Sequence, residues 1–453
     1  MLHLNDSIHG WERFGEYNDN TFLKPFIEGS WMTKHDGKYY LQYGAPGTEF
    51  SGYSDGVVVG TGPLGPFTPQ SDPVSFKPGG FARGAGHGAT FQDNQNNYWH
   101  ISTMNVTVKN TFERRIGIWP AGFDKDDIMY CNTAFGDYPH WAPAPSGSPN
   151  GEGSITQPSL LPDADKTISS PKVENQKQAF NESRNIKKVS SKSGPLSASK
   201  ASLAGGGLEG AVGSFTGWML LNYNKPVQVS STLASYYANY AVDENIKTYW
   251  SAATGNKGEW IQTDLGNLSL VNAVQINYAD QDVDSNRLGK WPGQYHQYKL
   301  YTSADGKKWN LLADKSNNKT DIPHEYLELT TPVQTRYIRL ENIHMPTGKF
   351  AISGLRVFGN GNGAKPDMVK QFIVLRTEKD KRSAYIKWSP VDNAFAYNIY
   401  YGIAPDKLYS CVMVHSANDY WFKAMDNQKP YYFTIEAVNE NGVSEKTKLM
   451  KAD

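Results

Sequence analysis

Short runs of β-branched and aromatic residues, broken by glycine and proline, most constrain what this chain can fold into. In the first 145 residues such runs occur at Lys38–Tyr43 and Val57–Val59, and the spacing of an amphipathic helix is absent there. Similar runs return between Trp218 and Phe358, and again between residues 366 and 453. The pattern predicts an all-β protein.

A chain of 453 residues is too long for a single hydrophobic core, and its length alone favours about three domains. Residues 146–213 are rich in serine, lysine, glycine, proline and asparagine, which predicts a linker or disordered insertion. The remaining strand-rich segments predict folded domains at residues 1–145, 214–360 and 366–453.

The charges exclude some classes of partner. Lysine and arginine together number 45, as do aspartate and glutamate, so the whole chain offers no electrostatic attraction for nucleic acid or an anionic membrane. We expect no membrane span, because the chain lacks a run of about 18 apolar residues. Residues 1–30 also lack the order of a signal peptide. A neutral polymer remains a suitable partner.

A weak repeat occurs in the first domain. The segment His35–Leu41 places a polar turn before an aromatic strand, and Asn94–His100 does the same roughly 59 residues later. This spacing is typical of successive blades of a β-propeller.

The segment Phe26–Lys34 contains a Glu28-Gly29 pair and is followed by Gly37-Lys38-Tyr39-Tyr40-Leu41. It resembles glycoside hydrolase family 43, whose members are five-bladed propellers, although Ser30 stands where proline is usual. The resemblance implies that Glu28 is the general acid. A carboxyl group desolvated in a propeller funnel stays protonated near neutral pH and can protonate a leaving glycosidic oxygen.

Two later segments resemble the same family. Arg83–Gly88 resembles its Gly-His segment, which implies that His87 lies near the propeller axis, although a loop histidine is the alternative. Glu113–Pro120 resembles the strand that carries a substrate-binding arginine. This implies a role for Arg114, with Arg115 as the second choice and a surface ion pair as the ordinary alternative.

The general base and the aspartate that modulates the acid lie, in that family, in blades before the glutamate. Here Asp6 and Asp19 are the only aspartates before Glu28, and neither sits in a blade-start motif. The sequence therefore predicts a truncated, partial propeller of about three blades that forms an open arc. Whether such a chain is an enzyme stays open, and no cofactor is expected for catalysis.

Three segments in the second domain carry another resemblance: Ala238–Trp250, Trp260–Gly266, and Arg336–Leu340 followed by Val357-Phe358-Gly359. They resemble a coagulation factor 5/8 type C, or discoidin, domain of the kind used as family 32 carbohydrate-binding modules. The resemblance implies a jelly-roll sandwich over residues 214–360.

That resemblance also implies a structural calcium ion, held by Asp243, Asn245 and Thr248. Glu244 replaces the usual glycine, and Ser353 takes the place of a glutamate that commonly completes the site. The alternative is a loop held only by hydrogen bonds.

Sugar contacts in such modules come from loops at one end of the sandwich, here residues 284–296. An exposed aromatic ring stacks on a pyranose while polar side chains bond its hydroxyls. The predicted sugar-binding residues are Arg287, Trp291, Tyr295 and His296. For the two aromatic residues, packing within the loop is the alternative.

The last domain resembles fibronectin type III in the segments Lys387–Pro390, Tyr397–Gly402 and Tyr431–Asn439. Trp388 is expected in the core, and Tyr432 is expected to pin the sandwich corner. The resemblance implies a spacer.

Two functions follow from these resemblances. One is an inverting glycoside hydrolase that acts on a polysaccharide or oligosaccharide in polysaccharide degradation, placed by its family outside the cell, in the periplasm or at the cell surface. The alternative is a non-catalytic glycan-binding or adhesion protein that uses only the discoidin module. A protein-binding scaffold at the cell surface is a third, weaker possibility.

Overall fold

The computed structural model describes residues 3–20, 22–94, 96–108, 113–139, 217–283 and 293–453. The predicted linker at 146–213 lies outside these residues, as do Arg287 and Trp291. Within them, the helices are three short 3₁₀ turns, η1 (Gly10–Glu12), η2 (Glu16–Asn18) and η3 (Ala238–Ala241), and all other regular elements are strands. The all-β prediction is confirmed.

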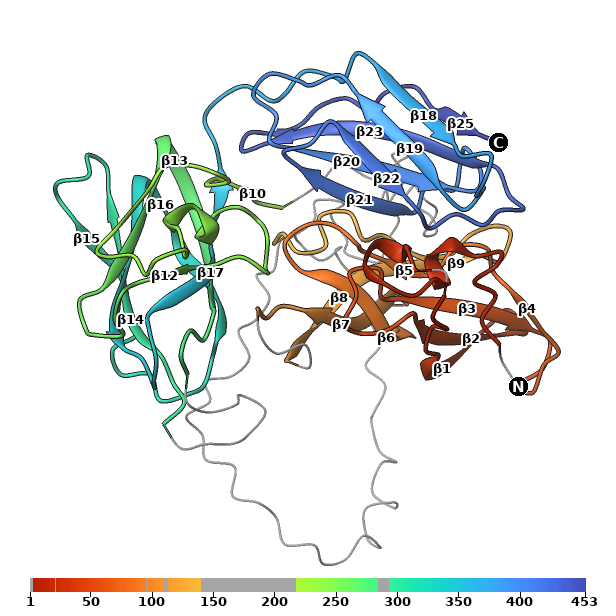
Figure 1. The fold of residues 1–453 in the computed structure, drawn as a ribbon, viewed down its shortest axis with the longest axis horizontal. Coiled ribbons are helices and arrows are strands. Elements are labelled where there is room, and N and C mark those ends of the chain that lie inside the picture. The colour runs from red at the N-terminus through yellow and green to blue at the C-terminus, as the bar shows by residue number, and fades with distance from the viewer. Residues whose placement is uncertain (1–2, 21, 95, 109–112, 140–216, 284–292) are drawn as a thin grey trace, which may run out of the picture. The chain divides into compact units, whose positions relative to one another are not determined.

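Two antiparallel sheets form the first part of the chain (Figure 1). The first contains β1 (Glu28–His35), β2 (Lys38–Ala45), β3 (Ser54–Gly60) and β4 (Phe67–Pro69), in chain order, with β5 (Ser75–Phe76) also paired to β3. The second contains β6 (Arg83–Gln92), β7 (Tyr98–Asn105), β8 (Arg114–Phe123) and β9 (Met129–Cys131), again in chain order. The main path of each sheet is a meander of four strands, the form of a propeller blade.

The repeat predicted from the sequence corresponds to the first hairpin of each sheet, since β1 pairs with β2 and β6 pairs with β7. The expectation of about three blades was wrong, because the described residues form two. Residues 3–20 lack an alternating run and form no strand. Instead Trp11 is fully buried against Gly56, where a Cβ atom would come within 2.2 Å of its ring.

The second sheet keeps an apolar face in contact with solvent. Ile116 is 74% exposed and Ile118 is 51% exposed, while the alternate residues Gly117 and Trp119 are buried. Side chains alternate between the two faces of a strand, so both isoleucines lie on one face of β8. Such exposure is expected for a partial propeller.

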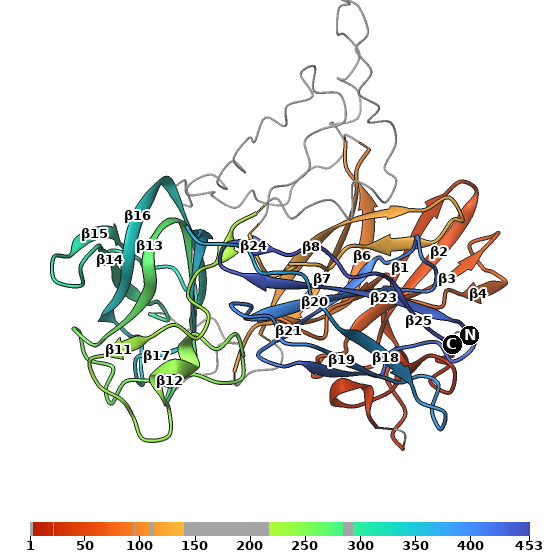
Figure 2. The same ribbon diagram turned by 90° about the horizontal axis from the view of Figure 1, so that it is seen from above.

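One eight-stranded antiparallel sheet makes up the second domain (Figure 2). Its main path is β10, β17, β13, β16, β14 and β15, with β11 on β13 and β12 on β17. The strands are β10 (Met219–Leu220), β11 (Val227–Val229), β12 (Trp250–Ser251), β13 (Trp260–Tyr278), β14 (Gln297–Ser303), β15 (Asn310–Asp314), β16 (His324–His344) and β17 (Ala351–Asn360).

The two longest strands of this sheet, β13 and β16, shift register between Asp264 and Ser269 and between Val271 and Ala273. Register shifts of this kind bend a strand and raise its twist. The bent sheet wraps around one core, which includes Trp250, Ile261 and Leu340. The result is the predicted discoidin-type sandwich.

The last domain is a sandwich of two sheets. One is β18 (Phe372–Arg376), β19 (Ala384–Trp388) and β22 (Asp419–Phe422). The other is β21 (Ser410–His415), β20 (Ala396–Gly402), β23 (Tyr431–Asn439) and β24 (Gly442–Val443), with β25 (Met450–Ala452) on β23. Trp388 is 3% exposed, so its predicted place in the core is confirmed.

The prediction that Tyr432 pins the sandwich corner was wrong, and the neighbouring Tyr431 has this role. The Tyr431 hydroxyl accepts a hydrogen bond from the backbone N–H of Asp426 at 2.9 Å, and Tyr431 is fully buried. Because side chains alternate along β23, Tyr431, Phe433 and Ile435 face the core, whereas Tyr432 remains partly exposed. A shift of one residue therefore separates the two tyrosines.

Candidate functional site

Glu28 begins β1 at a point where the backbone is irregular. The pairing of β1 with β2 shifts between Glu28 and Trp31, and Gly29 has a φ of 57°. A Cβ atom on Gly29 would lie 2.6 Å from the ring of His87. Glycine is therefore needed here for both its conformation and its size, and it brings β1 close to His87 on β6.

The Glu28 carboxyl is held from one side. The Tyr53 hydroxyl, just before β3, donates a hydrogen bond to Glu28 Oε1 at 2.6 Å. His87 Nδ1 lies 4.0 Å from the second oxygen, Glu28 Oε2. Burial first, and then the hydrogen bond to Glu28, raise the pKa of Tyr53, whereas the charge of Arg114 opposes the rise. Tyr53 is thus a neutral hydrogen-bond donor to this carboxyl group.

Arg114 begins β8 and faces the same group of residues. Its Nη1 donates to Thr48 Oγ1 at 2.7 Å and to Thr103 Oγ1 at 3.2 Å. The neighbouring Arg115 instead pairs with Glu113 at 3.5 Å and is largely exposed. Between the two arginines that the sequence offered, the geometry favours Arg114.

Three of the residues singled out from the sequence are linked through Tyr53: Glu28 accepts its hydrogen bond, His87 lies 4.0 Å from Glu28, and the charge of Arg114 acts on Tyr53. We call these four residues the Glu28 cluster. Tyr53 was missed because its only sequence signal is its position before a predicted strand. Together the four side chains offer a carboxyl group, an imidazole, a guanidinium and a hydroxyl, which are groups that hydrogen-bond sugar hydroxyls.

The cluster is more open than the funnel interior that the family resemblance implies. The side chain of Glu28 is 42% exposed and that of His87 is 50% exposed. The expected desolvation of Glu28 is not seen, because its side chain keeps contact with solvent.

Asp55 is a second carboxylate whose charge acts on Tyr53, but its side chain is not exposed within the Glu28 cluster. Asp55 is fully buried, where its Oδ2 lies 3.0 Å from His100 Nε2 and its Oδ1 accepts the Gly88 N–H at 3.0 Å. This buried pair ties the first sheet to the second and has no access to a water molecule in solvent. Asp6 pairs with Lys24 at 3.5 Å.

The loop predicted to hold calcium is closed by hydrogen bonds. The Asp243 carboxylate accepts the Asn245 N–H at 3.0 Å and the Thr248 hydroxyl at 2.7 Å. Burial raises the pKa of Asp243, although these bonds oppose the rise. The loop therefore holds oxygen donors from all three residues, the type of ligand that calcium takes, and hydrogen bonds within the loop already use them.

The structure shows the contacts of the two residues that depart from the usual calcium site, Glu244 and Ser353. Glu244 has a φ of 56°, the left-handed conformation that favours glycine. Its carboxylate makes a buried double hydrogen bond to Arg356, to Nε at 2.8 Å and Nη2 at 2.9 Å, which offsets the strain. Ser353 is buried and donates to the backbone carbonyl of Asn277 at 3.3 Å, so it brings no carboxylate to the loop.

Of the four residues predicted to bind sugar in the second domain, Tyr295 and His296 lie within the described part. Tyr295 is half-buried, with its ring centre 5.0 Å from that of His344. His296 is 2% exposed and stacks on Tyr278 at 3.7 Å. Its burial is that of a packing residue and argues against a direct sugar contact.

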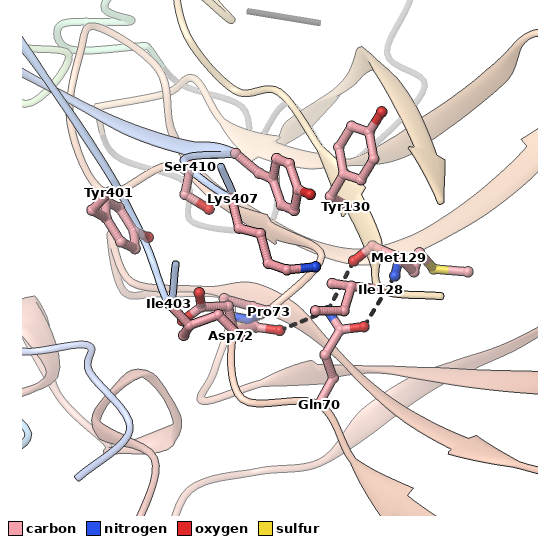
Figure 3. A pocket seen from close by; sticks show the side chains of 11 residues that line it. Gln70, Asp72, Pro73, Ile128, Met129, Tyr130, Tyr401, Ile403, Lys407 and Ser410 are labelled. Atoms are coloured by element: carbon pink, nitrogen blue, oxygen red, sulfur yellow. Dashed lines mark hydrogen bonds between the residues drawn. The ribbon is translucent and has the colours of Figure 1, made fainter. Parts of the chain in front are cut away.

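A narrow crevice lies beside segments Gln70–Pro73, Ile128–Tyr130 and Tyr401–Ser410 (Figure 3). The Gln70 side chain bonds both backbone groups of Met129, at 2.8 and 3.1 Å. The free volume is about 10 Å³, space for one water molecule and none for a sugar ring. This crevice is therefore a small gap between packed segments and not a binding site for a sugar.

In the part of the chain that the structure describes, no helix has the length and apolar character needed to cross a membrane.

Comparison with known proteins matches the F5/8 type C domain model to residues 226–354. A curated relative, Neuropilin-1a of Danio rerio, is 27% identical over 125 residues, which are 25% of this chain and 13% of that protein. The chain thus spans about 13% of the length of the curated relative it matches.

Two solved structures are also similar. One is described as a glycoside hydrolase, at 19% identity and a TM-score of 0.33, covering 75% of this chain and 61% of that one. The other is the family 32 module of C. perfringens NanJ in complex with galactose, at 18% identity and a TM-score of 0.26, covering 31% of this chain and 98% of that one. The domain model, the motifs and the sheet agree: residues 226–354 of this chain form an F5/8 type C domain.

Proposed function

We propose that this chain is a carbohydrate-active protein of the glycoside hydrolase type, with Glu28 as the general acid of a glycan site. One observation carries the proposal. Glu28, His87 and Arg114, which the family 43 resemblance implies, come from three strands of two sheets, yet Tyr53 bonds Glu28, His87 lies 4.0 Å from Glu28, and the charge of Arg114 acts on Tyr53. Unrelated surface residues have no reason to converge in this way.

In the proposed reaction, Glu28 protonates the glycosidic oxygen as its bond to the sugar breaks. Tyr53 holds Oε1, which leaves Oε2 to carry the proton toward the leaving group. Arg114 and His87 bond sugar hydroxyls and orient the ring. Inversion also needs a second carboxylate about 6.5–9.5 Å away to activate water. We propose that the described residues supply the acid half of this site.

The substrate class that suits these groups is a neutral plant or microbial glycan, such as an arabinan, xylan or galactan side chain. We further propose that the F5/8 type C domain binds the same polymer, with Asp243, Asn245 and Thr248 holding a calcium ion that orders its loop. The last domain serves as a spacer. Such a protein works outside the cell, in the periplasm or at the cell surface.

A non-catalytic glycan-binding or adhesion protein is the second candidate. The exposure of Glu28 and the burial of Asp55 favour this candidate. On this account the F5/8 type C domain binds the glycan and the Glu28 cluster contributes nothing.

Calorimetric titration of arabino-, xylo- and galacto-oligosaccharides into the full chain separates the two. We expect Arg114→Ala to weaken binding about tenfold, because a charged hydrogen-bond donor is lost. The matched control is Arg115→Ala, which removes the neighbouring arginine that pairs with Glu113 and leaves affinity unchanged. Binding that survives Arg114→Ala but is lost in Trp291→Ala would favour the adhesion protein.

A further inference from the structure

A second group of chemically active side chains lies at the end of β1 opposite to Glu28. His35 is the last residue of β1, Asp36 lies in the turn that follows, and Asp127 lies in the turn between β8 and β9. Each offers one ligand atom, and these atoms all lie within 4.8 Å of one another. The group joins the first sheet to the second, and the proposed glycan site uses none of it.

The imidazole of this group is held in place by residues outside it. His35 Nδ1 lies 3.0 Å from the Tyr98 hydroxyl, and the His35 ring stacks on Phe123 with 3.9 Å between ring centres and 5° between planes. These two contacts fix the ring and leave Nε2 facing Asp36 Oδ2 at 3.7 Å. Metal-binding histidines are oriented in this manner, with one nitrogen bonded to a neighbour and the other directed at the ion.

A cation already lies at one of the two carboxylates, that of Asp127. Lys38 Nζ is 2.6 Å from Asp127 Oδ2, and the Lys38 side chain is 41% exposed. An exposed lysine at the start of a strand can turn away into solvent at small cost. The ammonium group therefore competes with a metal ion for Asp127 without blocking access to it.

We propose that His35, Asp36 and Asp127 bind a divalent transition metal, of which zinc is the best fit. One imidazole nitrogen and two carboxylate oxygens are ligands that zinc accepts, and water completes its four positions. Calcium and magnesium prefer a set made of oxygens alone. The ion links residues far apart in sequence and so stabilises the packing of the two sheets.

Titration of zinc chloride into the full chain, by calorimetry and by thermal unfolding, tests this proposal. We expect one ion per chain to bind and to raise the unfolding temperature, since a ligand that binds the folded state stabilises it. Asp36→Asn changes a side chain that is 79% exposed, so it should fold normally and weaken binding at least about tenfold. His35→Gln should act in the same direction.

Two further variants make the test specific. Lys38→Ala removes the competing ammonium and should tighten zinc binding, an effect that a nonspecific site would not show. Asp126→Asn neutralises a neighbouring carboxylate that pairs with Lys407 at 2.7 Å, and it should leave affinity unchanged. The proposal is overturned if zinc does not bind the wild type, or if Asp36→Asn and His35→Gln bind it as tightly as the wild type.

Discussion

Asp137 provides the sharpest test of how the described parts of this chain are held together. Its carboxylate accepts the backbone N–H groups of Phe81 at 2.7 Å and Ala82 at 3.2 Å. It also lies 3.2 Å from Lys77 Nζ and 3.6 Å from Arg356 Nη2. Arg356 lies on β17 of the second domain, so this buried network joins that domain to the first part of the chain.

The pKa of Asp137 sets the size of the expected effect. Burial acts to raise it, but Lys77 and Arg356 outweigh burial and lower it from 3.8 to about 2. Burial lowers the pKa of Lys77, and the charge of Asp137 opposes this shift. A difference of about two pH units corresponds to about 2–3 kcal/mol. This contribution is present above about pH 4 and is lost as the pH falls toward about 2.

Urea unfolding of Asp137→Asn and the wild type measures this contribution. At pH 7 we expect the variant to lose about 3 kcal/mol, because it also leaves the buried Lys77 without its carboxylate partner. At about pH 3 the difference should shrink by about 1 kcal/mol, since part of the wild-type advantage is then gone.

The control for this experiment is Asp406→Asn, which removes an exposed partner of Lys125 and should leave stability unchanged at both pH values. An Asp137→Asn loss that is the same at both pH values would refute the electrostatic reasoning.

Two more predictions concern charge and metal. Burial raises the pKa of Asp72 to about 7; the Tyr431 hydrogen bond opposes this rise, and the charge of Asp426 adds to it. The contribution of Asp72 to the free energy of unfolding is therefore full below about pH 4 and is lost as the pH rises to 7. Asp72→Asn should therefore unfold at a higher temperature than the wild type at pH 8, and the increase in unfolding temperature should be smaller at pH 5. Equal increases at the two pH values would contradict this prediction. Calcium should raise the unfolding temperature of the wild type and not of Asp243→Asn, whereas an equal rise in both would place the ion elsewhere.

Alternation and turn chemistry were enough to predict the all-β fold and the first hairpins of the two sheets, and the fibronectin type III resemblance predicted the buried Trp388. These features depend on residues close together in sequence, for which local pattern is a sound guide. The predicted number of blades was too high because the residues before Glu28, which form no strand, were counted as part of the propeller. Tyr432 was chosen over Tyr431 because a tyrosine pair hides which member faces the core.

The site could be predicted in part. Glu28, His87 and Arg114 each lie in a recognisable segment, and the structure brings them together. Tyr53 and the Glu244–Arg356 pair could not be found, because each is a contact between side chains distant in sequence and neither partner carries a motif for it. Burial of His296 likewise depends on Tyr278, which sequence spacing does not place beside it.

The most direct test of the central claim is azide-dependent turnover of aryl arabinosides, xylosides and galactosides with poor leaving groups. Azide can replace the water that a missing base would activate, while protonation of the leaving group still depends on Glu28. We predict that the wild type and the control Glu378→Gln are nearly inactive without azide and gain activity with it, whereas Glu28→Gln gains none. Fast turnover without azide, or equal gains in Glu28→Gln and the wild type, would contradict this account.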